Sequence, residues 1–175
     1  MKYPTTNRSK VCERFAVHRT STEIRVYVFK QANILLPSTV NMSSTSGLHV
    51  AIYNDGGIYK HWSLFIDGPT DPEKTILHIM GSSTRYRFEM RNSNARNSTT
   101  LLELVYLCHV DNSKISAIKD AAQEITIHNE APGYNCQDYI LELLDELEEK
   151  KIIDRSNASY KRNRKKVEDK QEGLN

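Results

Sequence analysis

Cysteine is scarce in this chain, and its spacing fits neither a disulfide framework nor a metal site. The three cysteines are Cys12, Cys108 and Cys136. Their number is odd, which argues against a disulfide framework. No C-x-x-C pair and no cysteine–histidine spacing of a zinc site occurs. We therefore expect free thiols, no bound metal and no cofactor.

Long apolar segments are also missing. No stretch approaches the roughly 20 apolar residues that span a bilayer. The first residues, MKYPTTNRSKVCERF, contain no apolar segment of the signal-peptide type. Hydrophobic residues nevertheless make up 38% of the 175 residues, which is enough for the core of one domain. We therefore expect a cytoplasmic protein of one domain with no membrane span.

The basic residues are concentrated near the end of the chain. The net charge is only +2, but the segment from Arg155 to Lys170 has seven basic residues against two acidic ones. The basic residues that could contact a nucleic acid are Lys161, Arg162, Arg164, Lys165 and Lys166. Because this segment has few apolar residues, we expect 154–175 to be a disordered basic tail. Residues 1–12 are expected to be a disordered lead, and 13–153 the single domain.

Such a basic tail has two interpretations. It can bind a polyanion such as RNA, DNA or an acidic lipid, because clustered positive charge attracts phosphates. It can equally be a solvated extension that only aids solubility. The charge pattern leaves both interpretations open.

The periodicity of the apolar residues predicts strands followed by helices. The predicted strands are 23–30, 47–53, 58–67, 75–80, 85–91 and 101–110. The turn sequence NDGG at 54–57 predicts a hairpin between the second and third of them. Apolar residues then recur at helical spacing in a helix capped by Asn112 or Ser113 and in a helix over 136–151. This order predicts an α+β domain, with an antiparallel sheet of about five to six strands packed against two C-terminal helices.

The segment GYNCQDYI, residues 133–140, places Cys136 at the start of the second helix. Asn135 is a favoured N-cap, and Asp138 three residues later completes a reciprocal cap. The helix dipole and the free N–H groups should then favour the thiolate and lower the pKa of Cys136. The N–H groups of Cys136 and Gln137 could also stabilise an oxyanion. A buried packing cysteine has the same pattern, so both interpretations stay open.

A thiol nucleophile needs a base, which is usually a histidine. His61 and His78 lie on neighbouring predicted strands, and His61 shares one face of its strand with Ser63 and Asp67. His49, on the other strand of the hairpin, is an alternative third member. Each histidine alone is more often structural, but together with a thiol at a helix start they make a Cys–His–polar triad possible.

These segments together resemble a known family. The strand 61–66 (HWSLFI), the following strand with His78 and the later segment 135–140 (NCQDYI) resemble the circularly permuted papain-like fold. That group includes NlpC/P60-type peptidases, lecithin:retinol acyltransferase and related phospholipid acyltransferases. The resemblance covers roughly residues 48–152.

The resemblance implies acyl transfer through a covalent intermediate on Cys136. His61 would act as the base and His78 would orient its ring. The acyl group then passes to an amine in a transferase or to water in a thiol hydrolase, such as a peptidase or amidase. A non-catalytic binding module on the same fold is the third alternative.

More weakly, the chain resembles small fungal enzymes that make arginine-containing cyclodipeptides from aminoacyl-tRNA. This resemblance implies an aminoacyl-tRNA donor held by the basic tail. It also implies that Asp67, Asp71 or Glu89 recognises a guanidinium group. Ser63, on the same strand face as His61, is a further candidate for substrate binding.

Overall fold

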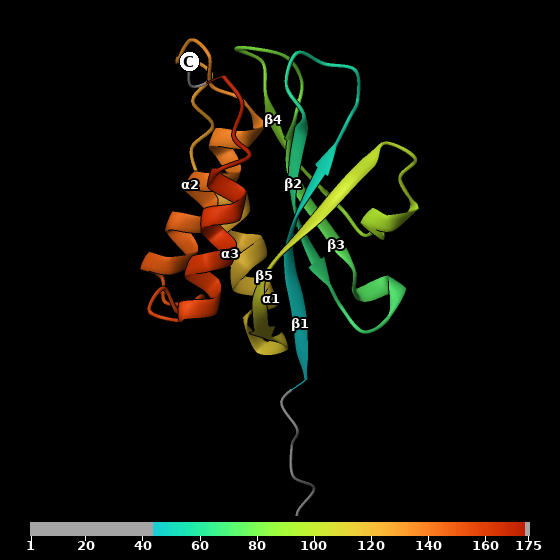
Figure 1. Cartoon of the computed structure of the whole chain (residues 1–175), viewed down its shortest axis with the longest axis vertical. Helices are drawn as coiled ribbons and strands as arrows, with labels where there is room; N and C mark the ends of the chain where they lie inside the picture. The colour runs from blue at the N-terminus through green and yellow to red at the C-terminus, as the bar shows by residue number, and fades with distance from the viewer. Residues whose placement is uncertain (1–43, 174–175) are drawn as a thin grey trace, which may run out of the picture. The chain divides into compact units, whose positions relative to one another are not determined.

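The computed structural model describes residues 44–173, which form one antiparallel sheet and three α-helices (Figure 1). The strands are β1 (Thr45–Tyr53), β2 (His61–Asp67), β3 (Thr75–Met80), β4 (Arg87–Arg91) and β5 (Leu101–Asp111). The helices are α1 (Ile115–Glu124), α2 (Cys136–Glu149) and α3 (Ala158–Glu168). None of these helices of residues 44–173 is long and apolar enough to cross a bilayer. The predicted α+β class is confirmed for this part of the chain, whereas the predicted strand 23–30 and the lead 1–12 lie outside the described residues.

The strands are arranged in the order β4-β3-β2-β1-β5. The interior strand β1 pairs along its length with β2 on one side and with the edge strand β5 on the other. In contrast, β2 and β3 pair only where 64–66 faces 75–77. The first residues of β2 and the last residues of β3, which carry His61 and His78, therefore lie beyond their main-chain pairing.

The loop of the hairpin between β1 and β2 is longer than predicted. We expected the second strand of this hairpin to begin at Ile58, but β2 begins at His61. Ile58 is 94% exposed, and the Lys60 N–H donates to the Glu172 carboxylate at 2.7 Å instead of to a strand. Residues 58–60 are thus diverted from the sheet by a contact with the far end of the chain.

The two predicted helices are present, and the cap of the first differs from the prediction. The first is preceded by a 3₁₀ turn that Asp111 caps, since its carboxylate accepts the Ser113 N–H at 2.8 Å. The predicted caps, Asn112 and Ser113, were therefore wrong, and α1 itself begins at Ile115. The second helix, α2, begins at Cys136 as predicted.

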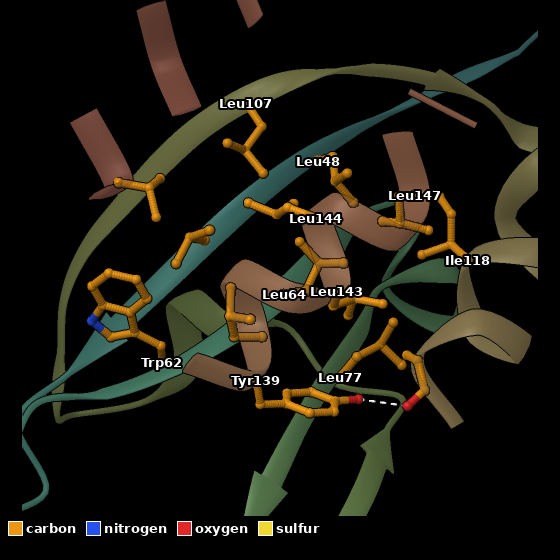
Figure 2. Close-up of a cluster of buried hydrophobic side chains, with 14 of the residues drawn as sticks. Leu48, Trp62, Leu64, Leu77, Leu107, Ile118, Tyr139, Leu143, Leu144 and Leu147 are labelled. Atoms are coloured by element: carbon orange, nitrogen blue, oxygen red, sulfur yellow. Dashed lines mark hydrogen bonds between the residues drawn. The ribbon is translucent and has the colours of Figure 1, made fainter. Parts of the chain in front are cut away.

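All three α-helices pack on the same face of the sheet, which we call the helix side (Figure 1). This face carries Leu48, Leu64 and Leu77, because alternate residues of a strand point to the same side. The apolar stripe of α2 packs on them, including Leu143 and Leu147 (Figure 2). Each such leucine stabilises the fold by about 1.5–3 kcal/mol through burial. This contact makes α2 the helix whose position is most firmly tied to the sheet.

The other face of the sheet, which we call the opposite side, has a smaller core. Its buried residues are Ala51, Tyr53, Phe65 and Ala95. Ala95 begins the short 3₁₀ helix Ala95–Asn97, which covers this side in place of an α-helix. Loop residues therefore enclose the opposite side.

The prediction of a disordered tail was wrong for residues 154–173, which include α3. Although α3 has few apolar residues, Tyr160 and Val167 are both buried in the helix-side core. The Asn163 side chain also donates a hydrogen bond to the Leu107 carbonyl of β5 at 3.1 Å. These contacts dock the helix on the domain.

Arg164 ties α3 to α2 through charge. Its guanidinium binds Asp145 and Glu148 of α2 and Glu168 of its own helix, and its side chain is only 17% exposed. Burial opposes the charge, but the hydrogen bonds to the three carboxylates outweigh this effect and raise the pKa of Arg164. Of the five predicted nucleic-acid contacts, Arg164 is thus structural, and the exposed ones are Lys161, Arg162, Lys165 and Lys166.

Replacing Arg164 should destabilise the fold much more than replacing its neighbour. We expect Arg164→Ala to lower the free energy of unfolding by about 1–3 kcal/mol, because three charged hydrogen bonds are lost. Lys165→Ala is the matched control, since it removes an exposed i,i+4 pair with Asp169 and should leave urea denaturation nearly unchanged. Equal effects of the two substitutions would show that the Arg164 contacts do not hold α3.

Candidate active site

Cys136 occupies the first position of α2, and the predicted cap is confirmed. The Asn135 side chain accepts the Gln137 N–H at 2.8 Å, and the Asn135 N–H donates to Asp138 at 2.9 Å. Gly133, with φ 88°, adopts the left-handed conformation that turns the chain into this cap. The backbone on both sides of the thiol is therefore held by hydrogen bonds.

The thiol of Cys136 lies against the main chain at the start of β2. The Trp62 N–H donates to Sγ at 3.4 Å, and the S–H donates to the Lys60 carbonyl at 3.9 Å. These two peptide groups flank His61. Within residues 44–173, no hydrogen bond joins Sγ to an imidazole, and Cys136 is 8% exposed.

The expected lowering of the Cys136 pKa is wrong in this structure. Burial raises the pKa of the thiol, because a thiolate loses its hydration there. The N–H groups of Trp62 and of Cys136 itself act in the other direction, but they do not outweigh burial. Cys136 is therefore a protonated thiol at neutral pH, and it needs a base to react.

Gln137, a predicted oxyanion donor, is fully buried and has other hydrogen-bond partners. Its N–H is used by the Asn135 cap. Its side-chain amide donates to the Lys60 carbonyl at 2.9 Å and accepts the Glu172 N–H at 2.8 Å. Of the two predicted oxyanion donors, only the Cys136 N–H is left for that role.

The end of the described chain crosses the start of α2. Glu172 binds the Lys60 N–H at 2.7 Å and the Lys60 ammonium at 2.5 Å. Gln171 donates to Asp138 at 2.9 Å. The hydrogen bonds from Lys60 hold the pKa of Glu172 below its ordinary value. The segment 171–173 thus joins the helix that carries the thiol to the strand that carries His61.

The two predicted histidines form a pair. His61 Nε2 and His78 Nδ1 are 2.9 Å apart. Because the main chains of β2 and β3 do not pair at this level, the two imidazoles connect the strands there. Burial lowers the pKa of His61, and burial together with His61 lowers the pKa of His78 to about 4. Both rings are therefore neutral at neutral pH.

The thiol and the imidazole pair approach β2 from different sides. The alternation of β2 and β3 puts the side chains of His61 and His78 on the opposite side of the sheet, with Tyr53 and Phe65. Cys136 belongs to the helix-side core. The structure thus brings all three residues to the start of β2, with its main chain between the thiol and the rings.

A pocket of about 370 Å³ lies on the opposite side, next to the imidazole pair. Its lining includes Asp55, Arg91 and both histidines, but not Cys136. The polar residues of 93–100 form another wall, with Ala95 at its base. The pocket therefore lies between the opposite side of the sheet and the loop 93–100, and it does not extend to the helix side.

Two of the predicted substrate residues are near this pocket. The buried Ser63 hydroxyl lies 3.3 Å from the Tyr53 hydroxyl, on the same side as His61. Glu89 is the register partner of His78 and accepts a hydrogen bond from Arg91 at 2.9 Å. Glu89 thus already has a cationic partner.

The remaining predicted residues lie at the other end of β2. Asp67 forms a bidentate pair with Arg96 at 3.0 and 2.7 Å, and this pairing lowers the pKa of Asp67. Asp71 pairs with Lys74 at 3.2 Å. His49, the alternative third member, faces Phe65 and not the imidazole pair. The structure therefore does not bring these residues to the site.

Sequence reasoning missed Asp55 and Arg91 as residues of the site. Asp55 lies in the NDGG turn, which we read only as a turn. Arg91 follows Glu89 by two residues on β4. The strand period therefore predicts that both side chains lie on the same side of the sheet as His78. The loop 93–100 has no comparable signal, because its position depends on tertiary packing.

The raised pKa of Cys136 can be measured by alkylation. In a Cys12→Ser/Cys108→Ser protein, we expect the alkylation rate to rise with pH through a midpoint above that of the same protein unfolded in urea. The reason is that only the thiolate reacts and burial disfavours it. A midpoint below that of the unfolded protein would show that the helix start dominates after all.

The contact between the Glu172 carboxylate and Lys60 should be lost only in acid. Because its pKa is lowered in the folded protein, the carboxylate stabilises the fold above its unfolded pKa, and this contribution disappears as the pH falls through the lowered value. We expect the NMR signal of the Gln137 side-chain amide to shift in that range. Glu172→Gln should abolish the shift, and an unchanged shift in this variant would contradict the assignment.

A family model matches the part of the chain that carries the thiol and the imidazole pair. The model of a family of unknown function, DUF6540, matches residues 48–154. This range includes His61, His78 and Cys136 and ends before α3. No curated protein and no solved structure matches the chain. Because the match spans more than half of the chain, the protein belongs to the DUF6540 family.

Proposed function

We propose that the protein is a cysteine-dependent acyl-transfer enzyme of the permuted papain-like type. Cys136 would be the nucleophile, His61 the base and His78 the residue that orients His61. One observation carries the proposal: the Cys136 thiol is held by the two peptide groups that flank His61, and His61 is itself bonded to His78 at 2.9 Å.

The proposal requires a defined protonation state of the pair. His61 uses Nε2 for His78, so Nδ1 is the nitrogen that would take the thiol proton. Nδ1 is bonded to Cγ, so it lies closer than Nε2 to the His61 main chain, which is flanked by the peptide groups that Sγ contacts. The β2 main chain lies between Sγ and this ring, so the start of β2 would have to shift, together with rotation of the Cys136 side chain, before Sγ could reach Nδ1. Catalytic hydrogen bonds are often loose before substrate binds.

The chemical steps then balance without a cofactor. The S–H proton passes to His61 Nδ1, and Sγ attacks the carbonyl carbon of an ester, thioester or amide. The Cys136 N–H stabilises the oxyanion. The bond to the leaving group breaks, the leaving group takes the proton from His61, and a thioester remains on Cys136. An amine or water then gives its proton to His61 and displaces Sγ, and His61 returns this proton to the thiolate.

An aminoacyl-tRNA is the donor that the charge distribution favours. The exposed face of α3 carries Lys161, Arg162, Lys165 and Lys166, and such a face attracts phosphates. Arg164 cannot take part, because three carboxylates already bind it. Recognition of a guanidinium by Asp67 is not supported, since Arg96 occupies its carboxylate.

The acyl-enzyme is the decisive species. We expect a mass increase equal to the acyl group when the protein meets an activated thioester, and no increase in Cys136→Ala. His61→Ala should slow acylation by about 100-fold or more, because a general base is lost. Cys108→Ser is the matched control and should react normally, since its thiol is outside the site. The measurement is intact-protein mass spectrometry with time.

The same experiment separates the alternatives. Transfer to an added amine supports the acyltransferase, whereas release of the free acid regardless of amine indicates a thiol hydrolase. Labelling that is equal in wild type and Cys136→Ala would rule out the thiol and favour a non-catalytic binding module. For the tRNA donor, Lys161→Glu/Lys165→Glu should weaken salt-sensitive RNA binding while the protein stays folded.

A further inference from the structure

His78 has a buried nitrogen without a partner. Its Nδ1 is bonded to His61, but its Nε2 is buried and makes no hydrogen bond within the described residues. The His78 side chain is among the lining of the 370 Å³ pocket, and the residue is 5% exposed. A buried polar nitrogen without a partner is costly, so it indicates a ligand or water that this site receives.

The proposed mechanism determines what this nitrogen offers. For His61 to act as a base, its Nδ1 must be free of a proton, so its Nε2 carries the proton and donates to His78 Nδ1. A neutral His78 that accepts at Nδ1 must carry its own proton at Nε2. The unpartnered nitrogen is then a donor, and its partner must be a hydrogen-bond acceptor.

Arg91 supplies positive charge to the same pocket. Its Nε and Nη2 both contact one oxygen of Glu89, at 2.9 and 2.8 Å, and its side chain is 50% exposed. Its register partner on β3 is Ile76, which also lines the pocket. The guanidinium can therefore bind a second acceptor without leaving Glu89, since it has five N–H donors.

Asp55 limits the charge of the ligand. It lines the pocket, and within residues 44–173 its carboxylate has no hydrogen bond or ion pair to a protein group. A second negative group near it would be repelled, whereas an amino or hydroxyl group could bind it. The walls thus suit a single anion better than a dianion.

The geometry points to this pocket as a binding site for a small monocarboxylate, whose carboxylate accepts hydrogen bonds from His78 Nε2 and from the Arg91 guanidinium. The volume is at the lower end of the roughly 300–1,000 Å³ of ligand pockets, so the ligand is small. The inference rests on the proposed function in one respect only, which is the assignment of the His78 proton to Nε2.

Benzoate is a suitable probe for the full-length protein. We expect it to bind with a dissociation constant of about 1 mM or tighter, measured by NMR titration. Benzamide and benzylamine, which keep the ring but not the carboxylate, should bind at least about tenfold more weakly. The imidazole nitrogen spectrum should show the proton of His78 on Nε2, with a shift of this signal on binding.

Arg91→Gln should weaken benzoate about tenfold or more, because a charged donor is lost. Arg87→Gln is the matched control: Arg87 lies on the same strand and the same side, but it does not line the pocket. Its substitution should leave binding unchanged. Equal effects of the two substitutions would overturn the assignment of Arg91.

Three outcomes would overturn the inference: no saturable binding of benzoate, tighter binding of benzylamine than of benzoate, or a His78 proton on Nδ1. Cys136→Ala separates the inference from the proposed function, because this variant should bind benzoate normally. If no acyl-enzyme forms but benzoate binds with the stated dependence on Arg91, the proposed function fails and the pocket stands. If acylation occurs without benzoate binding, the reverse holds.

Discussion

The packing of α2 on the sheet is the contact on which the rest of the structure depends. Its leucines bury themselves against β1, β2 and β3, so the helix cannot slide without losing the core. The Asn135 cap then makes the helix begin at a defined residue, and the Gln137 side chain ties this N-terminal end to the Lys60 carbonyl. The hydrophobic core thus carries a thiol at this position to the start of β2, and the polar contacts of Asn135 and Gln137 fix it there.

Much of the fold follows from local signals in the sequence. The strand alternation and the helical spacing predicted the order of β1 to β5, α1 and α2, because each element buries one face against the same core. The largest failure concerned α3, which was predicted to be disordered. Its segment reads as disordered because only Tyr160 and Val167 are buried apolar residues there, whereas Arg164 holds it through carboxylates that lie 16 and 19 positions earlier in the chain. Periodicity contains no information about such pairing.

The sequence predicted that His61, His78 and Cys136 come to the start of β2, but not that the β2 main chain separates the thiol from the two rings. The structure does not bring Asp67, Asp71 or His49 there. Neighbouring strands brought His61 and His78 together, and the cap pattern placed Cys136 at the first helical position. The thiol pKa was misjudged because a sequence shows the helix start but not the burial that outweighs it. The pocket beside His78 needed the loop 93–100, whose position is set only by tertiary contacts.

The docking of α3 also bears on how the sheet ends. β5 is an edge strand, and edge strands offer unpaired main-chain groups to other chains. Asn163 donates to the carbonyl of Leu107, which has no register partner on β1, and the helix packs along the strand. The basic helix therefore covers part of an edge strand that another chain could otherwise pair with. Truncating the chain before α3 would expose this strand and also remove Tyr160 and Val167 from the core, whatever the helix contributes to binding. Charge reversals that keep the helix in place separate its structural role from binding.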